Sequence, residues 1–461
     1  MSLSSVSRES LKPSVVSASS RYAERVNPQW VRLLNLLGMN VRYERCLGAE
    51  LWTEGGDRYL DFLSGYCVHN AGHNHPRIIE ALKEELDRSG PAMLQSHVPD
   101  LAGELAERLC RLAGGGLSKV FFASSGSEGV EAAIKFSRAV TGRDGLLYAE
   151  RAFHGLTCGA LSLMDNEFWR AGFGPLLPHT EAVPFNDVSA VEQKLQTRKF
   201  AAFIVEPIQS EGGIRIPSPD YLRQVQSLCK RYGTLSVLDE VQTGMFRTGK
   251  FLAGQHFDLQ PDMVILAKAL SGGLVPVAAV LMTDSVNDAV YSSLKRAIVH
   301  TSTFGENSLA MRAGLATLDV LEDENLGERS THLGHLLRRR LTETLSEYDM
   351  FKAAPGMGLL SGIEFKVPSK PALRLSFEAF KAIHPGMFGQ MLVMKLFRHE
   401  RVLTQICGNN FMVLKSAPPL VAKEQHIEEF VASLGRVVAE VHNSTAFWSE
   451  ALGLARRAIN V

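Results

Sequence analysis

Short apolar runs alternate with longer amphipathic segments through the middle of the chain, between about residues 120 and 280. Runs of this kind, bounded by polar or glycine-rich turns, are typical of strands buried on both faces of a sheet. Because helical segments separate them, we expect an α/β fold with a mostly parallel sheet sandwiched by helices. The runs are Val120 to Ala123, Leu146 to Ala149, Ala201 to Val205, Leu235 to Leu238 and Met263 to Leu266.

Helical spacing of apolar residues recurs on both sides of this region. A Gly-Gly turn within Glu50 to Leu63 predicts a β-hairpin, and Gly356 to Phe365 and Asn410 to Leu414 are predicted strands. The predicted helices cover residues 27–37, 76–87, 100–112, 128–140, 308–321, 326–347 and 426–441.

A chain of 461 residues is too long for one hydrophobic core, so more than one domain is expected. We expect a flexible Ser-rich tail over residues 1–25, although its scarcity of acidic residues also suits a targeting segment. Residues 26–75 would contribute to a small domain and to the mouth of the active site. Residues 76–320 would form the large domain, and residues 321–461 a smaller α+β domain.

Composition narrows the possible classes of function. Hydrophobic residues make up 45% of the chain and charged residues 21%, and the formal net charge is zero. Without a long basic run, nucleic acid is not an expected partner, and no apolar stretch reaches the roughly 18 residues of a membrane helix. The six cysteines are scattered without a CxxC pair, as in reduced cytoplasmic proteins.

Polar residues follow several of the predicted strands at the point where each ends. Glu206 ends one apolar run, Asp239 and Glu240 end the next, and Lys268 follows a third, just before a glycine pair. Because the carboxyl ends of parallel strands converge on one crevice, these side chains are expected to meet there.

An acid and a lysine in such positions are what pyridoxal 5'-phosphate chemistry requires. The lysine holds the cofactor as a Schiff base, and the acid keeps the pyridine nitrogen protonated so that the ring accepts electrons. We therefore predict that Lys268 and Asp239 bind this cofactor and take part in the reaction.

The segment Ser124 to Ser127 lies between a predicted strand and a predicted helix. Free backbone N–H groups, the helix dipole and the hydroxyls would form a site for a phosphate there. An ordinary helix cap is the alternative, since Ser and Gly also favour caps. Phe153, at another strand end beside His154, could stack on a planar cofactor or simply pack in the core.

Residues 64–76 combine Tyr66, Cys67, His69, His73 and His75 in a Gly- and Asn-containing loop. A metal site is one interpretation of this cluster. Zinc sites usually need a second group of ligands downstream, and none is found. We therefore expect no metal, with the histidines hydrogen-bonded within the loop.

Over residues 45–440 the sequence resembles the class III (ω-amino acid type) aminotransferases, which are pyridoxal-phosphate enzymes of fold type I. It resembles most the putrescine (diamine) and the ornithine or acetylornithine branches. The resemblance rests on motifs in order: GDRYLDFLSG, GHNHP, SSGSEGVEAAIK, AFHG, VEPIQSEGG, LDEVQTGMFRTGK, PDMVILAKALSGG, STFGEN and SAPPL.

The resemblance implies roles for individual residues. Lys268 matches the Schiff-base lysine, and Asp239 matches the acid paired with the pyridine nitrogen. Gln242 resembles the residue that hydrogen-bonds the phenolic oxygen. The remaining matches are Ser125, Gly126 and Ser127 at the phosphate, Phe153 with His154 at the ring, and Glu206 near the cofactor.

Three further matches concern the substrate and the oligomer. Thr303 resembles a threonine that reaches the phosphate in a neighbouring subunit, which implies a homodimer with active sites at the interface. Glu211 resembles a gate acid that faces the substrate, and Tyr66 a tyrosine at the substrate mouth.

Two positions depart from relatives that act on amino acids. An arginine often stands three residues before the Pro-Pro pair, but here it is Lys415, which lacks a bidentate fork for a carboxylate. Some members also have a basic residue directly after the FHG triplet, where this chain has Leu156. Recognition of an α-carboxylate is therefore weakened.

We predict a transaminase that moves an amino group between a primary amine and a 2-oxo acid such as pyruvate or 2-oxoglutarate. The alternatives are an ornithine or acetylornithine aminotransferase and an enzyme that aminates a fatty or polyketide-like aldehyde. The Met- and Phe-rich stretch between residues 379 and 414 motivates the last, because it would line an apolar channel unless it packs in the core.

Overall fold

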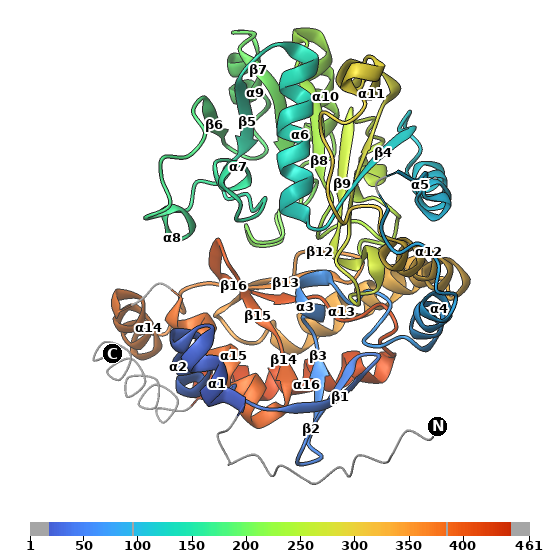
Figure 1. Cartoon of the computed structure of the whole chain (residues 1–461). Helices are drawn as coiled ribbons and strands as arrows, with labels where there is room; N and C mark the ends of the chain where they lie inside the picture. The colour runs from blue at the N-terminus through green and yellow to red at the C-terminus, as the bar shows by residue number, and fades with distance from the viewer. Residues whose placement is uncertain (1–17, 95, 384–385, 444–461) are drawn as a thin grey trace, which may run out of the picture.

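The computed structural model describes residues 18–94, 96–383 and 386–443. A large lobe surrounds a seven-stranded sheet, and a small lobe contains two further sheets and lies below it in Figure 1. Residues 1–17 of the predicted tail lie outside the described part. Residues 18–25 were also assigned to the tail, but they form helix α1 (Ala18–Arg25), which packs against α2 (Pro28–Leu37).

The seven-stranded sheet confirms the expected α/β class. Its strands lie in the order β4-β10-β9-β8-β7-β5-β6. The strands from β9 to β6 run parallel, whereas β10 is antiparallel to both of its neighbours. Every predicted run is a strand, and the sheet comprises β4 (Lys119–Ala123), β5 (Gly145–Ala149), β6 (Thr180–Val183), β7 (Phe200–Val205), β8 (Leu235–Asp239), β9 (Met263–Leu266) and β10 (Ala278–Met282).

Alternate side chains of the central strands enter two separate cores, one on each face of the sheet. Leu146 and Tyr148 of β5 belong to the core shared with helix α6 (Gly126–Thr141), whereas Leu147 and Ala149 belong to the core on the opposite face. Because both faces are buried, the central strands carry apolar residues at nearly every position. The same burial fixes where each strand ends, and so where its polar residue lies.

Helices and short turns connect the strands of the large lobe and cover both faces of its sheet. Helix α6 packs across β4, β7, β8, β9 and β10, and α12 packs against α4 and α5. The helices are α4 (Pro76–Asp87), α5 (Asp100–Ala113), α7 (Cys158–Leu161), α8 (Glu167–Arg170), α9 (Val188–Leu195), α10 (Tyr221–Tyr232), α11 (Asp284–Val290) and α12 (Ser308–Asp323), with short 3-10 turns η1 (Ala253–Phe257), η2 (Lys268–Ser271) and η3 (Leu294–Arg296). The short helix α3 (Ser64–Cys67) follows the strands of the small lobe.

The small lobe joins the two ends of the chain. The hairpin β2 (Glu50–Thr53) and β3 (Arg58–Asp61) was predicted, and β3 also pairs in parallel with β14 (Val402–Leu403) near the C-terminus. This pairing supports the proposal that residues 26–75 contribute to the small domain. The remaining strands are β1 (Tyr43–Leu47), β11 (Phe351–Ala353), β12 (Gly356–Met357), β13 (Leu360–Phe365), β15 (Gln405–Cys407) and β16 (Asn410–Ser416).

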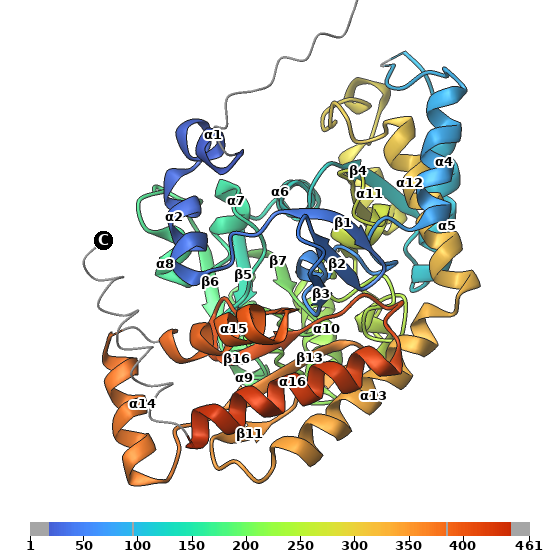
Figure 2. The ribbon, with the colours of Figure 1, turned by 90° about the horizontal axis from the view of Figure 1, so that it is seen from below.

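One predicted strand is divided in the structure. Gly356 to Phe365 forms a tight hairpin of β12 and β13, because the chain turns at Gly358, whose φ is +54°. Helices α13 and α16 lie side by side across this lobe in Figure 2. The small-lobe helices are α13 (Leu326–Leu345), α14 (Pro371–Ile383), α15 (Met387–Glu400) and α16 (Glu424–Asn443).

The Met- and Phe-rich stretch forms core rather than an access channel. Phe388, Met391, Met394 and Phe397 of helix α15 are all buried, and the Phe388 ring packs on Phe377 with their centroids 4.9 Å apart. Packing of α15 against α16 and β16 accounts for the apolar sequence there. His384 and Pro385 of this stretch lie outside the described residues.

In the described part of the chain, no helix has the length and apolar character needed to cross a membrane. The same residues contain no group of three or more His, Cys, Asp or Glu arranged to hold a metal ion. In the histidine-containing loop, His69 stacks on His73 with ring centroids 3.9 Å apart, and His73 Nε2 lies 2.6 Å from Asp61 Oδ2.

Candidate active site

A cavity of about 480 Å³ lies at the carboxyl ends of the parallel strands. Residues that the sequence predicts at strand ends converge on it, as the parallel topology predicts. They are Ser124 to Ser127, Asp239 and Lys268. Its lining residues are Val68, Ser124 to Ser127, Phe153 to Gly155, Glu206, Asp239, Val241, Gln242, Ala267, Lys268, Ser271 and Gly273 to Val277.

One end of the cavity is formed by the N-terminus of helix α6. The hydroxyl of Ser125, the N-cap residue, accepts the Glu128 N–H at 3.3 Å, and the Glu128 carboxylate accepts the Ser124 N–H at 2.8 Å. The first-turn N–H groups of a 16-residue helix, with its dipole, face this end. The segment is therefore both a helix cap and a donor-rich site suited to an anion.

Close packing at Gly155 brings the next loop onto the same turn. Gly155 has a φ of +124°, and a Cβ atom there would lie 2.0 Å from the Ser127 hydroxyl oxygen. That oxygen accepts the Leu156 N–H at 3.3 Å, so the hydroxyl hydrogen remains available to a ligand. The adjacent loop thus fixes the orientation of Ser127.

Asp239 ends β8 at the floor of the cavity. Its Oδ2 lies 2.8 Å from His154 Nδ1, and its Oδ1 accepts the Val241 N–H at 3.1 Å. Burial opposes a charged imidazole, but the hydrogen bond and charge of Asp239 outweigh it and raise the pKa of His154. His154 therefore orients the carboxylate of Asp239, which the sequence predicts to lie beside the cofactor.

Glu206 lies in the same cavity, and its carboxyl group has a raised pKa. Its carboxylate accepts the N–H groups of Phe153 at 3.0 Å and Ser210 at 3.2 Å. Burial raises its pKa to about 7, although the charge of His154 and these N–H groups act in the opposite direction. The contact fixes the backbone of Phe153, whose ring lines the cavity.

Lys268 follows β9 directly and begins the short turn η2. Its φ of +48° lies in the left-handed region, where a non-glycine residue is strained. Burial lowers the pKa of its ammonium, while Cys67, Glu211 and Asp239 oppose this effect. A lowered pKa makes the neutral amine, which is the nucleophilic form, more accessible.

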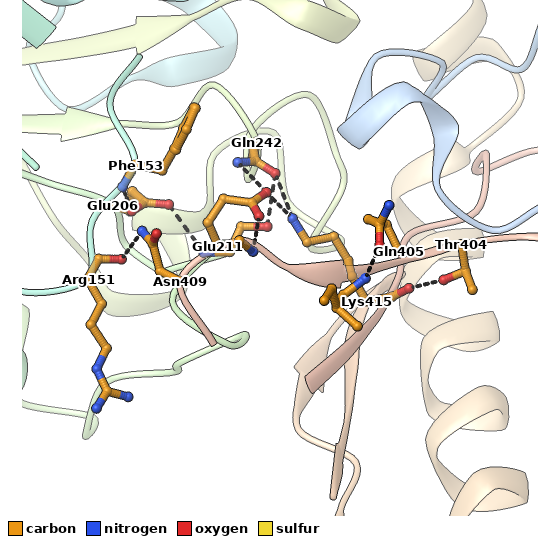
Figure 3. A network of polar contacts seen from close by, with 12 residues as sticks. Arg151, Phe153, Glu206, Glu211, Gln242, Thr404, Gln405, Asn409 and Lys415 are labelled. Atoms are coloured by element: carbon orange, nitrogen blue, oxygen red, sulfur yellow. Dashed lines mark hydrogen bonds and ion pairs between the residues drawn. The ribbon is translucent and has the colours of Figure 1, made fainter. Parts of the chain in front are cut away.

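Beyond the cavity, a second polar network joins the large lobe to the small lobe, as shown in Figure 3. The Lys415 ammonium of β16 donates to the Glu211 carboxylate and, at 3.4 Å, to the Gln242 side-chain oxygen. Gln242 Nε2 also donates to Glu211 at 3.3 Å. Lys415 is fully buried and lies over the Tyr66 ring, 5.3 Å from its centroid.

The charges of this network stabilise each other. Burial by itself would raise the pKa of Glu211, but Lys415 holds it below its ordinary value. Burial would likewise lower the pKa of Lys415, and Glu211 raises it instead. At neutral pH the two side chains therefore form a charged buried pair.

Thr303 is the predicted site residue that the structure does not bring to this cavity. It is exposed and lines a separate cavity of about 1070 Å³, together with Ser302 and Ile298. Leu156, at the position of a basic residue in some relatives, is 55% exposed. The other predicted residues lie at the cavity or in the network beside it.

Two features of the site were missed by sequence reasoning. The contact between His154 and Asp239 spans 85 positions, and the AFHG motif gave only a hint of it. Asn409 and Trp169, which lie next to Glu211 and Phe153, had no signal at all, because neither residue belongs to a recognisable spacing.

The residues present fit pyridoxal phosphate. A helix N-terminus with two hydroxyls suits the phosphate, Phe153 offers an aromatic face, and Asp239 supplies an oriented carboxylate for a pyridine nitrogen. Lys268 is a buried amine that lines the same cavity. His154 Nε2 is buried without a partner among the described residues, which leaves one polar atom for a ligand or water.

Comparisons with known proteins agree with this fit. The family described as aminotransferase class-III matches residues 35–438. The aminotransferase PigE of a Serratia species is 35% identical over 452 residues, or 91% of this chain and 53% of PigE, so the chain spans about half of PigE. A putrescine aminotransferase of Pectobacterium atrosepticum is 42% identical over 320 residues, which is 68% of each protein.

The fold matches solved structures of the same family. An ornithine aminotransferase from Toxoplasma gondii, whose structure contains pyridoxal phosphate at partial occupancy, superposes with a TM-score of 0.78 and 30% identity. The match covers 87% of this chain and 90% of that one. This chain therefore belongs to the class-III aminotransferases, a family of pyridoxal-phosphate-dependent enzymes.

Proposed function

We propose that this aminotransferase moves an amino group between a primary amine without a neighbouring carboxylate and a 2-oxo acid. The observation that carries the proposal is the bonding of Lys415. Its ammonium donates to Glu211 and Gln242 and lies 5.3 Å from the centroid of the Tyr66 ring. A substrate carboxylate would therefore have to compete with the buried Glu211 carboxylate for this ammonium.

A bidentate clamp for a carboxylate is also missing from the cavity. Among the described residues that line it, none is an arginine. The exposed Leu156 presents an apolar surface where a basic side chain would favour an amino acid. Both features favour an amine with an uncharged or cationic tail, such as a diamine, over ornithine or acetylornithine.

The residues of the cavity divide the work of the reaction. When bound, pyridoxal phosphate supplies a carbonyl that combines with the amine and a ring that withdraws electrons from the adjacent carbon. We propose that Lys268 removes the proton from that carbon and transfers it to the cofactor. The carboxylate of Asp239, oriented by His154, would keep a proton on the pyridine nitrogen.

The other cofactor contacts follow the same proposal. Ser125, Gly126 and Ser127 would hold the phosphate, Phe153 would contact the ring, and Gln242 would donate to the phenolic oxygen. Glu206 holds the Phe153 backbone in place, as its hydrogen bond indicates. Tyr66, 38% exposed at the mouth, then contacts the tail of the amine.

The proposal for a long-chain aldehyde loses its main support. It was motivated by the Met- and Phe-rich stretch, whose described side chains in α15 are buried in the small lobe. Amination of an aldehyde remains the same reaction in the opposite direction, so a short aldehyde is also a substrate under this proposal.

The direct test is a substrate panel with the purified, pyridoxal-phosphate-loaded protein. Putrescine, 1-butylamine, ornithine and acetylornithine are each mixed with enzyme, and loss of the cofactor's visible absorbance is followed without a 2-oxo acid. We expect one half-turnover and then a stop, at least about tenfold faster with the amines than with ornithine. Faster reaction with ornithine, or continued turnover without a 2-oxo acid, would refute the proposal; Lys268→Ala is the inactive control.

We also propose that the enzyme is a homodimer in which Thr303 contacts the cofactor phosphate of the partner copy. The hydroxyls of Ser302 and Thr303 lie on the second cavity, beside the exposed apolar residues Leu94 and Ile298. An exposed apolar rim around polar groups is typical of a protein interface. A second copy would cover this surface and complete both sites.

A further inference from the structure

The peptide group that joins Ala152 to Phe153 is hydrogen-bonded on both of its sides. Its N–H, which belongs to Phe153, donates to the Glu206 carboxylate at 3.0 Å. Its oxygen, which belongs to Ala152, accepts the side-chain amide of Asn409 at 3.0 Å. Glu206 follows β7 in the large lobe, whereas Asn409 lies in the turn between β15 and β16 of the small lobe. One side chain from each lobe therefore holds this peptide group.

The Asn409 side chain uses its full hydrogen-bonding capacity on the large lobe. Its Nδ2 also donates to the Arg151 backbone oxygen at 3.1 Å. Its Oδ1 accepts from Asn166 Nδ2 at 2.8 Å and from Trp169 Nε1 at 3.2 Å. An amide has two donor hydrogens and two acceptor lone pairs, so these contacts define one orientation of the group. Figure 3 shows Asn409 beside the Arg151 backbone.

The backbone of the same hairpin turn is also bonded to the large lobe. The Asn409 N–H donates to the Glu211 backbone oxygen at 2.9 Å, and the Gly408 N–H donates to the Glu211 carboxylate at 2.8 Å. A Cβ atom at Gly213 would lie 2.6 Å from Asn410 Nδ2, so the close approach of the turn requires a glycine there. The position of the Asn409 side chain therefore follows from the way the two lobes pack.

Phe153 connects these contacts to the cofactor cavity. It lines the same cavity as Lys268 and Asp239, whereas Asn409 is not among the described residues that line it. Because the peptide group before Phe153 is held on both sides, the backbone that carries the Phe153 side chain is fixed. The direct route from Asn409 to the cofactor is therefore the Phe153 backbone.

We propose that Asn409 is a positioning residue for the cofactor. From the small lobe it holds the Ala152–Phe153 peptide group, and so it keeps the Phe153 side chain against the cofactor ring. The contact between Phe153 and the ring rests on the proposed function, whereas the hydrogen bonds of Asn409 are those described above. Because coupling between two sites is reciprocal, the bound cofactor and the docked hairpin turn stabilise each other. The small lobe thus contributes to cofactor binding through a residue outside the cavity.

The experiment is a double-mutant cycle on the dissociation constant of pyridoxal phosphate, measured by absorbance titration of the cofactor-free full chain. Asn409→Asp keeps the oxygen that accepts from Asn166 and Trp169 but loses both Nδ2 donors. The loss of two hydrogen bonds to backbone oxygens should raise the dissociation constant at least about fivefold. Phe153→Ala should also raise it. In the Phe153→Ala background, Asn409→Asp should change it by less than about twofold, because the side chain that Asn409 positions is absent.

Asn74→Asp is the matched control. Asn74 Nδ2 also donates to a backbone oxygen, that of Cys46 at 2.9 Å, and neither residue is among the described residues that line the cavity. Its dissociation constant should equal that of wild type. If Asn409→Asp does not fold, as judged by near-ultraviolet circular dichroism of the cofactor-free protein, Asn409→Ala takes its place in the same cycle.

Three results would overturn the inference. They are an unchanged dissociation constant in the Asn409 variant, an equal rise in Asn74→Asp, and effects of the Asn409 and Phe153 variants that simply multiply in the double variant. The last result is the one that a purely structural role of Asn409 would give. Unchanged binding in Phe153→Ala would instead refute the proposed contact between Phe153 and the cofactor ring, and the inference with it.

Discussion

Replacement of Lys415 by Met tests the buried ion pair on which the proposed substrate preference depends. The variant keeps the apolar stem but removes the ammonium, so the Glu211 carboxylate retains only the Gly408 N–H and the Gln242 amide. Removing one partner from a fully buried pair costs about 3–5 kcal/mol, because the other charge is left unpaired. We expect a loss of this size in the free energy of unfolding at neutral pH.

A second variant separates the charge effect from lost packing. In Lys415→Met combined with Glu211→Gln, both charges are absent, so the combined loss should be smaller than that of Lys415→Met alone. The surface pair Lys352–Glu364 provides the control, since Lys352 is 55% exposed. Its variant Lys352→Met should cost less than about 1 kcal/mol.

The effect of the Lys415–Glu211 pair on the free energy of unfolding depends on pH in a definite direction. In wild type the pKa of Glu211 is depressed, so its contribution to stability is present above its unfolded pKa and is lost as pH falls through the folded pKa. In Lys415→Met the same carboxyl becomes easier to protonate. Lowering the pH therefore removes its unpaired charge and reduces the destabilisation of the variant. The stability difference between the two proteins should therefore shrink as the pH is lowered.

The assay is urea unfolding of the cofactor-free proteins, followed by tryptophan fluorescence and near-ultraviolet circular dichroism. Two results would refute the reasoning. Effects of the single variants Lys415→Met and Glu211→Gln that add within about 0.5 kcal/mol in the double variant would show that the side chains are not coupled. A loss in Lys415→Met no larger than in Lys352→Met would show that the pair is not desolvated.

Other sites give separate expectations. Burial raises the pKa of Glu206 to about 7. The unfolding free energy of wild type should therefore fall by about 2 kcal/mol between about pH 5.5 and pH 8, and that of Glu206→Gln should not. The same pH dependence in both proteins, measured by urea unfolding, would contradict this. His154→Phe removes the hydrogen bond to Asp239 and should weaken pyridoxal phosphate binding about 10- to 100-fold in an absorbance titration, and unchanged affinity would exclude the orienting role. Co-expressed Lys268→Ala and Thr303→Val chains should be more active than either variant alone at limiting cofactor, since one site in each mixed dimer is intact; activity no higher than that of the separate variants would contradict the shared site.

The sequence predicted the sheet, and the meeting of Asp239 and Lys268 at one of its edges, for a simple reason. Strands buried on both faces show as continuous apolar runs, and in a parallel sheet their carboxyl ends lie at one edge. Asp239 and Lys268 each follow such a run, so their meeting in one cavity did not depend on details of packing. Strands β6 and β10 were not predicted; the sequence of the edge strand β6, TEAV, is short and only partly buried.

Contacts between the lobes had no comparable signal. Lys415 and Glu211 are 204 positions apart, and their pairing depends on how the β15–β16 hairpin packs against the large lobe. The motif comparison identified both residues individually, but not that the Lys415 ammonium is paired with Glu211 and Gln242. The Met- and Phe-rich stretch shows the same ambiguity, since core and channel require similar residues.

Sequence alone therefore determined the α/β class and the meeting of Asp239 and Lys268 at one cavity, because both follow from local patterns at strand ends. The tertiary structure decided which groups pair, and with it the protonation of the site. It placed His154 on Asp239, Lys415 on Glu211, and Asn409 between Trp169 and the backbone before Phe153. Hydrogen bonds act over about 3 Å, so partners far apart in the chain are fixed only when the two lobes pack together.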